Sequence, residues 1–250
     1  MDELGNLYCT TLSGASILKI DREGGHSVWA QCACPNGQII LPDGDHLICD
    51  SKDSTIIRFS GAGRLLNDEL DGKFLSEPVR VPNDLAMDEW GGIYFTDSIR
   101  EKGKIVYLDP HGEAHIIARN LDYPNGISVS PDKKQLYIAE SYRNRIIVIR
   151  LSSPGIAEGE PECFAELPFH SSGNPLQNLP DGIAFDAEGN LYVAHYGMQA
   201  IQVLNKNGGL IGSIEMPFPL VSNVFINDNT LIATGGFNEP GPGGLFTTTI

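Results

Sequence analysis

The stretch PNGISVSPDKKQLYIAES at residues 124–141 decides the fold of this chain. It opens on the tripeptide Pro124-Asn125-Gly126, in which Pro and Gly favour a sharp turn and Asn tolerates unusual backbone angles. Alternating apolar residues follow, then a turn at residues 131–134 and a second apolar run that ends at Glu140. Alternation with a period of two indicates strands and not a helix, so the stretch predicts two strands joined by a tight turn.

This stretch recurs along the chain, each time behind a similar opening that we call the anchor. The copies are PNGQIILPDGDHLICDS at 35–51, PNDLAMDEWGGIYFTDS at 82–98, PDGIAFDAEGNLYVAHY at 180–196 and the weaker SNVFINDNTLIATGG at 222–236. A repeat of about 40 to 50 residues made of short strands is typical of a β-propeller blade. The segment GNLYCTTLSGASILKI at 5–20 matches the second half of the same unit. We therefore predict an all-β, six-bladed β-propeller whose first blade is incomplete at the amino terminus, forming a single domain over residues 1–250.

Strand-like runs and two polar loops complete the predicted organisation. The partial first unit contains three runs, at 7–11, 16–20 and 27–32. Polar loops at 67–81 and 168–179 precede the third and fifth anchors. Insertions into a repeat array usually map to one face, often the binding face. We expect these two loops to form the rim of a substrate site.

The formal net charge of −15 limits the classes of partner. Such a charge repels phosphates, which disfavours nucleic acid and anionic membranes as partners. It suits a cation site or a neutral or cationic ligand, although an acid excess can also serve solubility alone. The chain has no run of 18 apolar residues, and its first residues lack the basic and apolar regions of a signal peptide. These features predict a cytoplasmic protein without a membrane partner.

The anchors form the first candidate site. In a propeller the inner strand of each blade lines the central channel. If each anchor begins an inner strand, one side chain from every anchor converges on one mouth of the channel: Asn36, Asn83, Asn125, Asp181 and Asn223. Amide oxygens and a carboxylate are hard ligands that suit calcium or another divalent cation. The alternative is that they only form turns, but five in register favour the ligand interpretation.

A second ring of polar residues follows each anchor after 14 or 15 positions and comprises Asp50, Asp97, Glu140 and His195. The second strand of each unit runs back toward the mouth, so these residues should lie there too. They could support the metal ligands or contact substrate, or they could make turn hydrogen bonds at strand ends. For Asp50 we favour the turn hydrogen bonds. We expect His195, which can exchange protons near neutral pH, to contact substrate or a water and not the metal.

The motifs PNDLAMDEWGGIYFTD, PNGISVSPDKKQLYIAES and PDGIAFDAEGNLYVAHYG resemble the gluconolactonase family, the group of senescence marker protein (regucalcin) and luciferin-regenerating enzyme. The resemblance covers nearly the whole chain. It implies a six-bladed propeller with a divalent cation at the channel mouth, most often calcium, with zinc, manganese and magnesium as the other candidates. By this resemblance Asn125 and Asp181 are metal ligands, and Asn83 contacts metal or substrate. Glu140 and His195 are the further expected substrate contacts.

The reaction that this resemblance implies is the hydrolysis of a small-molecule lactone or ester. A bound cation would polarise the ester carbonyl, and Asp181 would activate the attacking water. The family's remaining ligand, a Glu of the first blade, lies before the strand that matches residues 5–8, where this sequence has no residues. We expect roughly 20 further residues upstream, enough for two short strands and a turn. The alternative is a non-catalytic propeller, a binding or scaffold protein that has lost this Glu.

Overall fold

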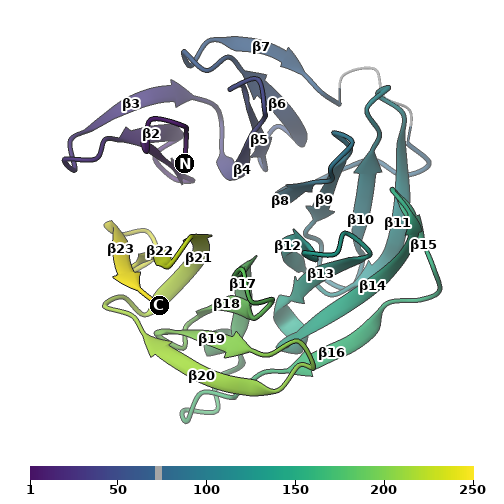
Figure 1. Ribbon diagram of the computed structural model, residues 1–250, viewed down its shortest axis with the longest axis vertical. Coiled ribbons are helices and arrows are strands. Elements are labelled where there is room, and N and C mark those ends of the chain that lie inside the picture. The colour runs from purple at the N-terminus through teal and green to yellow at the C-terminus, as the bar shows by residue number, and fades with distance from the viewer. Residues whose placement is uncertain (71–74) are drawn as a thin grey trace.

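The computed structural model describes residues 1–70 and 75–250, which contain 23 strands and two short 3-10 helices. These strands form six antiparallel sheets around a common axis (Figure 1). The predicted six-bladed propeller is therefore confirmed. In the described chain the first sheet has no inner strand, as expected, and consists of β1 (Leu7–Thr11), β2 (Ser16–Ile20) and β3 (His26–Gln31).

The next three sheets begin on an inner strand and continue outward. The second contains β4 (Pro35–Ile40), β5 (His46–Asp50), β6 (Thr55–Phe59) and β7 (Leu65–Asp68). The third contains β8 (Pro82–Met87), β9 (Ile93–Asp97), β10 (Gly103–Leu108) and β11 (Ala114–Leu121). The fourth contains β12 (Pro124–Val129), β13 (Gln135–Glu140), β14 (Arg145–Ser153), β15 (Ile156–Ala157) and β16 (Glu162–Glu166).

The last two sheets complete the ring. The fifth contains β17 (Leu179–Phe185), β18 (Leu191–Tyr196), β19 (Ala200–Leu204) and β20 (Leu210–Glu215). The sixth contains β21 (Leu220–Asn227), β22 (Thr230–Gly236) and β23 (Gly243–Thr249). The five strands that begin at or next to an anchor line the centre, and both chain ends lie on the side where the first and last sheets face each other (Figure 1).

The core lies between neighbouring sheets, as β14 illustrates. Residues 146–149 of this strand are all apolar and buried, as expected where both faces of a strand are covered. Successive side chains of a strand point to opposite faces. Ile147 and Ile149 accordingly pack with the third blade, whereas Ile146 and Val148 pack with the fifth. Each such burial contributes about 1.5–3 kcal/mol, so the repeated sheets stabilise one another face to face.

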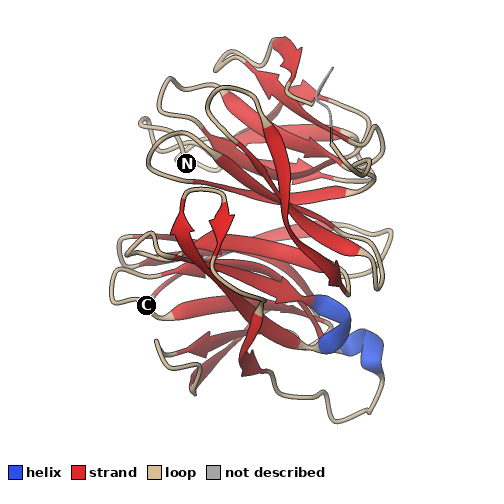
Figure 2. Ribbon diagram, turned by 90° about the vertical axis from the view of Figure 1, so that its right-hand side faces the viewer, coloured by secondary structure: helices blue, strands red, loops and turns tan. Residues whose placement is uncertain are grey.

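The two polar loops differ in how much of their structure is described. The predicted loop 67–81 begins within β7, and its residues 71–74 lie outside the described residues. The loop 168–179 contains the 3-10 helix η2 (Pro175–Gln177), which is capped by the Asn174 side chain. The other 3-10 helix, η1 (Ser141–Arg143), follows β13, and Figure 2 shows the two helices close together on one face. Within the described residues, no helix is long and apolar enough to cross a membrane.

Candidate metal and active site at the channel mouth

Both predicted rings lie at the same end of the channel. Each anchor proline is the cross-strand partner of a second-ring residue; Pro124, for example, pairs with Glu140, and Pro180 pairs with His195. Immediately after the proline the ladder shifts register in all four of these blades. Such a β-bulge leaves extra residues unpaired and re-aims their side chains. The bulge therefore turns the second anchor residue of each blade out of the ordinary alternation at the mouth.

The inner strands approach each other most closely at the anchor glycines. A Cβ atom added at Gly126 would overlap the carbonyl oxygen of Asp181 and would lie 2.7 Å from the Cα of Gly182. A Cβ at Gly182 would overlap the side-chain oxygen of Asn223. Only glycine leaves room for this approach. The absence of a side chain at Gly126 thus sets the spacing between β12 and β17, the strands that carry Asn125 and Asp181.

The three residues predicted to hold a metal lie on three adjacent inner strands. Asn83 is on β8, Asn125 is on β12 and Asp181 is on β17. Asn83 and Asn125 are buried, and Asp181 is half-buried. The Asn125 amide lies against the Asp181 carboxylate and also donates to the Ser141 hydroxyl at 3.3 Å. The structure therefore brings Asn125 and Asp181 together and places Asn83 one strand further round.

A second carboxylate, Asp84, lies beside Asp181 at the same mouth and is not among the predicted site residues. Asp84 occupies the position that is glycine in the PNG and PDG anchors. This departure from the repeat is the sequence feature that could have identified Asp84 as a site residue. Its carboxylate accepts the Ile127 N–H at 3.2 Å. Burial raises the pKa of Asp84 to about 6. Burial also raises the pKa of Asp181 well above its usual range, and the negative charge of Asp84 adds to this effect. Burial and mutual repulsion therefore disfavour the charged forms of these two carboxylates, and a bound cation would stabilise them.

Asp50, Asp97 and Glu140 of the second ring bind backbone N–H groups. Asp50 accepts the Ala33 and Cys34 N–H groups at 2.8 and 3.1 Å. Asp97 accepts those of Arg80 and Val81, and Glu140 accepts that of Asp122 at 2.7 Å. All of these N–H groups lie just before an anchor. The turn-bonding alternative therefore describes these three carboxylates, and the predicted contact of Glu140 with substrate stays a prediction.

His195 differs from the other members of its ring. Its side chain has no exposed surface, and neither ring nitrogen has a hydrogen-bond partner among the described residues. Burial lowers the pKa of His195 to about 4, an effect that the neighbouring Asn178 backbone partly opposes. Its cross-strand partner is Ala200, whereas Asp97 and Glu140 face the cations Lys104 and Arg145. A neutral ring suits a position without a cation, and the predicted contact of His195 with substrate or water stays a prediction.

A serine after the second strand links each of three blades to the next. The Ser51 and Ser141 hydroxyls donate to the carbonyls of Pro82 and Pro180 at 2.7 and 2.6 Å, and Ser98 donates in the same way to Pro124. Each of these carbonyls belongs to the anchor of the following blade. The only sequence signal was a serine directly after Asp50, Asp97 and Glu140, and it did not reveal the partner across the blade boundary.

Aromatic and charged side chains that were not among the predicted site residues lie near Asp181 at the rim. The Tyr196 hydroxyl donates to Glu239 at 2.7 Å. Burial raises the pKa of Tyr123, and the charges of Asp181 and Glu239 add to it. The Tyr123 and Tyr142 rings meet edge to face, with centroids 5.5 Å apart. No repeat pattern predicts these contacts, because Tyr196 ends β18 where three other blades have serine, and the other three residues lie outside the strands.

The donor set at the mouth is a mixture of amide and carboxylate oxygens. In the part of the chain that the structure describes, no three His, Cys, Asp or Glu side chains come together as a metal site. A cation here would depend on the amide oxygens of Asn83 and Asn125 together with the Asp181 carboxylate. Calcium binds carboxylates, amide carbonyls and waters in this way. The uncompensated carboxylates and the hard donors therefore fit an oxygen-loving divalent cation.

Comparisons with known proteins identify the family to which the chain belongs. The profile described as "SMP-30/Gluconolactonase/LRE-like region" matches residues 1–234. Lactonase drp35 of Staphylococcus aureus (strain USA300) is 35% identical over 230 residues, which are 86% of this chain and 68% of that protein. The chain spans about two thirds of the length of several of the curated lactonases that it matches.

Solved structures show the same fold at lower sequence identity. The gluconolactonase XC5397 from Xanthomonas campestris superposes with a TM-score of 0.82 at 24% identity, covering 99% of this chain and 83% of its own. Regucalcin from Agrobacterium tumefaciens, described as a calcium-binding protein, gives 0.76 at 21% identity over 92% of this chain and 78% of its own. With a family profile that covers nearly all of its residues, this chain belongs to the SMP-30/gluconolactonase/LRE-like family.

Proposed function

We propose that this chain is a divalent-cation-dependent lactonase whose site is the channel mouth. The observation that carries the proposal is the placement of Asn83, Asn125 and Asp181 on three adjacent inner strands, each within a β-bulge. The drp35 relatives are named lactonases, and XC5397 is described as a gluconolactonase. Calcium is the proposed cation because the donors are hard oxygens and because the Agrobacterium neighbour is described as calcium-binding.

The roles of the side chains follow from their chemistry. Asn125 and Asp181 would hold the cation, and Asn83 would contact the cation or the substrate. The cation would supply Lewis acidity to the ester carbonyl. Asp181 would take a proton from the attacking water at a carboxylate oxygen. The substrate would be a small lactone or ester. Neither nucleic acid nor a membrane would be a partner, in keeping with the net charge of −15.

A panel of lactones, measured with chelator-treated protein before and after calcium is added, tests this proposal. Asn125→Ala should abolish turnover. Asn36→Ala is the matched control, because Asn36 holds the same anchor position and donates in the same way to Ser51 at 3.3 Å but is outside the proposed ligand set. Turnover that survives Asn125→Ala, or that Asn36→Ala removes equally, would contradict the ligand assignment.

A non-catalytic binding or scaffold propeller is the second candidate. It is favoured by the lack, among the described residues, of three His, Cys, Asp or Glu side chains that converge. The two functions differ in the effect of calcium on stability. A ligand at 100 times its dissociation constant stabilises by about 2.7 kcal/mol, so a melting temperature that calcium leaves unchanged would favour the scaffold.

A further inference from the structure

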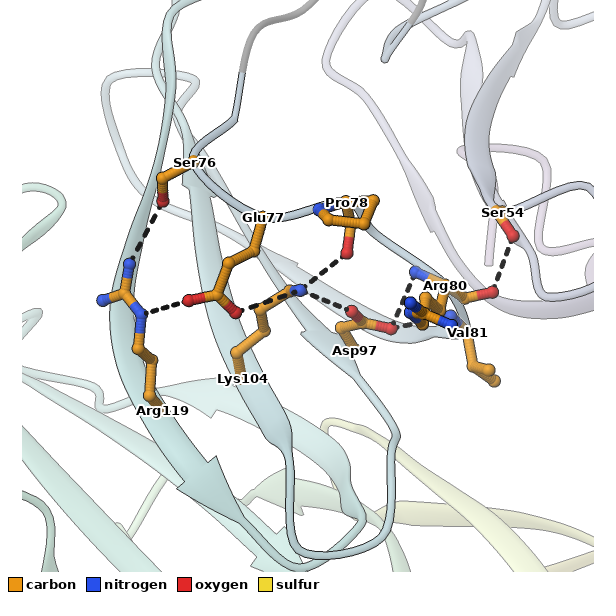
Figure 3. A network of polar contacts seen from close by, with 9 residues as sticks. All are labelled: Ser54, Ser76, Glu77, Pro78, Arg80, Val81, Asp97, Lys104 and Arg119. Carbon is orange, nitrogen blue, oxygen red and sulfur yellow. Dashed lines mark hydrogen bonds and ion pairs between the residues drawn. The ribbon is translucent and has the colours of Figure 1, made fainter.

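The residues that lead into Asn83 are held by a network of polar contacts centred on Asp97 and Lys104 (Figure 3). Asp97 ends β9 and Lys104 begins β10, and the two are direct cross-strand partners. The Asp97 side chain has no exposed surface, and that of Lys104 is 6% exposed. Buried charges are costly unless they are paired and hydrogen-bonded, so the contacts of both side chains indicate what this pair does.

Asp97 uses its two carboxylate oxygens differently. Oδ1 accepts the backbone N–H groups of Val81 at 2.6 Å and Arg80 at 3.1 Å. Oδ2 lies 3.2 Å from the Lys104 ammonium. Lys104 thereby fixes the carboxylate in the orientation that presents Oδ1 to the backbone just before Asn83.

The backbone on the other side of Asn83 is also fixed from β9. The Asp84 N–H donates to the Thr96 hydroxyl at 3.0 Å, and Thr96 is the residue before Asp97. Asn83 therefore sits at the β-bulge between two held N–H groups, those of Val81 and Asp84. This arrangement leaves the Asn83 backbone little freedom to move away from the mouth.

Lys104 also ties the described part of the preceding loop to the third blade. Its ammonium donates to the Pro78 carbonyl at 2.7 Å and lies 3.8 Å from the Glu77 carboxylate. Glu77 pairs in turn with Arg119 on β11 at 3.0 Å. The same cation therefore orients Asp97 and holds the chain that enters β8.

The second blade provides a natural comparison. Asp50 grips the Ala33 and Cys34 N–H groups before Asn36 as Asp97 grips those before Asn83. Its cross-strand partner is the neutral Thr55. The grip alone is therefore a general feature of these blades, whereas a buried lysine orienting the carboxylate distinguishes the blade that carries Asn83 from that of Asn36.

We propose that Asp97, oriented by Lys104, is a positioning residue that sets the Asn83 amide for the bound cation. The inference rests on the proposed cation site and assigns Asp97 no contact with cation or substrate. Outer partners of metal ligands typically change metal affinity by about 10- to 100-fold when they are removed. Loss of the Asp97 acceptor should weaken calcium binding by a factor in this range.

The test compares calcium affinity in Asp97→Ala and Asp50→Ala by titration calorimetry, at a temperature where melting curves show both proteins folded. Both variants lose the same kind of backbone grip. We expect Asp97→Ala to bind calcium at least about tenfold more weakly, and Asp50→Ala to stay within about threefold of the parent protein.

A second pair of variants keeps the test valid if Asp97→Ala does not fold. Asp97→Asn with Lys104→Met keeps the acceptor oxygen without buried charge, whereas Asp97→Leu with Lys104→Met removes both. The first pair should retain the parent affinity and the second should lose it. Equal affinities in the two pairs, or equal losses in Asp97→Ala and Asp50→Ala, would overturn the positioning role alone. A parent protein that binds no calcium would overturn this role together with the proposed cation site.

Discussion

Replacing Gly126 by alanine tests whether the close approach of β12 and β17 builds the site. The added Cβ would overlap the Asp181 carbonyl oxygen and would lie 2.9 Å from the backbone nitrogen of Ile183. These are backbone atoms of a central strand, so a rotamer change cannot relieve the overlap. Overpacking of this kind costs about 1–3 kcal/mol. In a chain of 150–250 residues 1 kcal/mol shifts the melting temperature by about 2–4 °C, which gives an expected loss of about 2–12 °C.

The assay is thermal unfolding of Gly126→Ala beside a matched control, Gly212→Ala. Gly212 lies on the outer strand β20, where the nearest atoms to an added Cβ are those of Val203 at 3.8 and 3.9 Å, an ordinary contact distance. The control should therefore melt like the parent protein. Since the displaced atom belongs to Asp181, Gly126→Ala should also bind calcium more weakly. If the two variants melted alike and bound calcium alike, the spacing of β12 and β17 would not depend on Gly126.

Two further predictions concern buried polar groups. Ser141→Ala removes the donor to the Pro180 carbonyl and should lower the free energy of unfolding in urea by about 1–3 kcal/mol. Ser152→Ala, at an exposed position, serves as the control. Equal free energies of unfolding in the two variants would contradict the role of the serine link. Burial lowers the pKa of His46, enclosed by Tyr8 and Trp29, from 6.5 to about 4, so the unfolded chain takes up a proton below pH 6.5 that the folded chain refuses. The contribution of His46 to the free energy of unfolding should therefore fall by about 2 kcal/mol between pH 6.5 and 5, so stability should fall more steeply in the parent protein than in His46→Gln. Parallel pH profiles would refute this account.

The architecture could be predicted because it depends on patterns within a single repeat. Strands β1 and β2 have the predicted bounds, since alternation and the flanking turns specify them locally. The apolar run at 146–149 is typical of a strand covered on both faces, and Ile146 and Ile147 do pack with different blades. The common end of the two rings also followed from strand direction, as the pairing of Pro124 with Glu140 shows.

The side-chain contacts at the mouth could not be predicted in the same way. The Ser141 link to Pro180 crosses a blade boundary, and its partners are 39 residues apart. A spacing of 14 or 15 residues placed Asp97 at the mouth, but it could not show that its carboxylate turns back to Val81. Asp84 was not predicted because the repeat identifies residues that the anchors share, such as Asn83, whereas Asp84 differs from the glycine found at its position in the other anchors.

The most direct test of the central claim is lactone hydrolysis by chelator-treated protein, before and after calcium is restored, in the parent chain and in Asp181→Asn. Asparagine keeps the size of the side chain and removes the charge that would hold the cation and take the proton from water. The proposed function predicts that chelation abolishes turnover in the parent chain, that calcium restores it, and that Asp181→Asn is inactive in both conditions. Turnover that persists after chelation, or an Asp181→Asn variant as active as the parent, would contradict it.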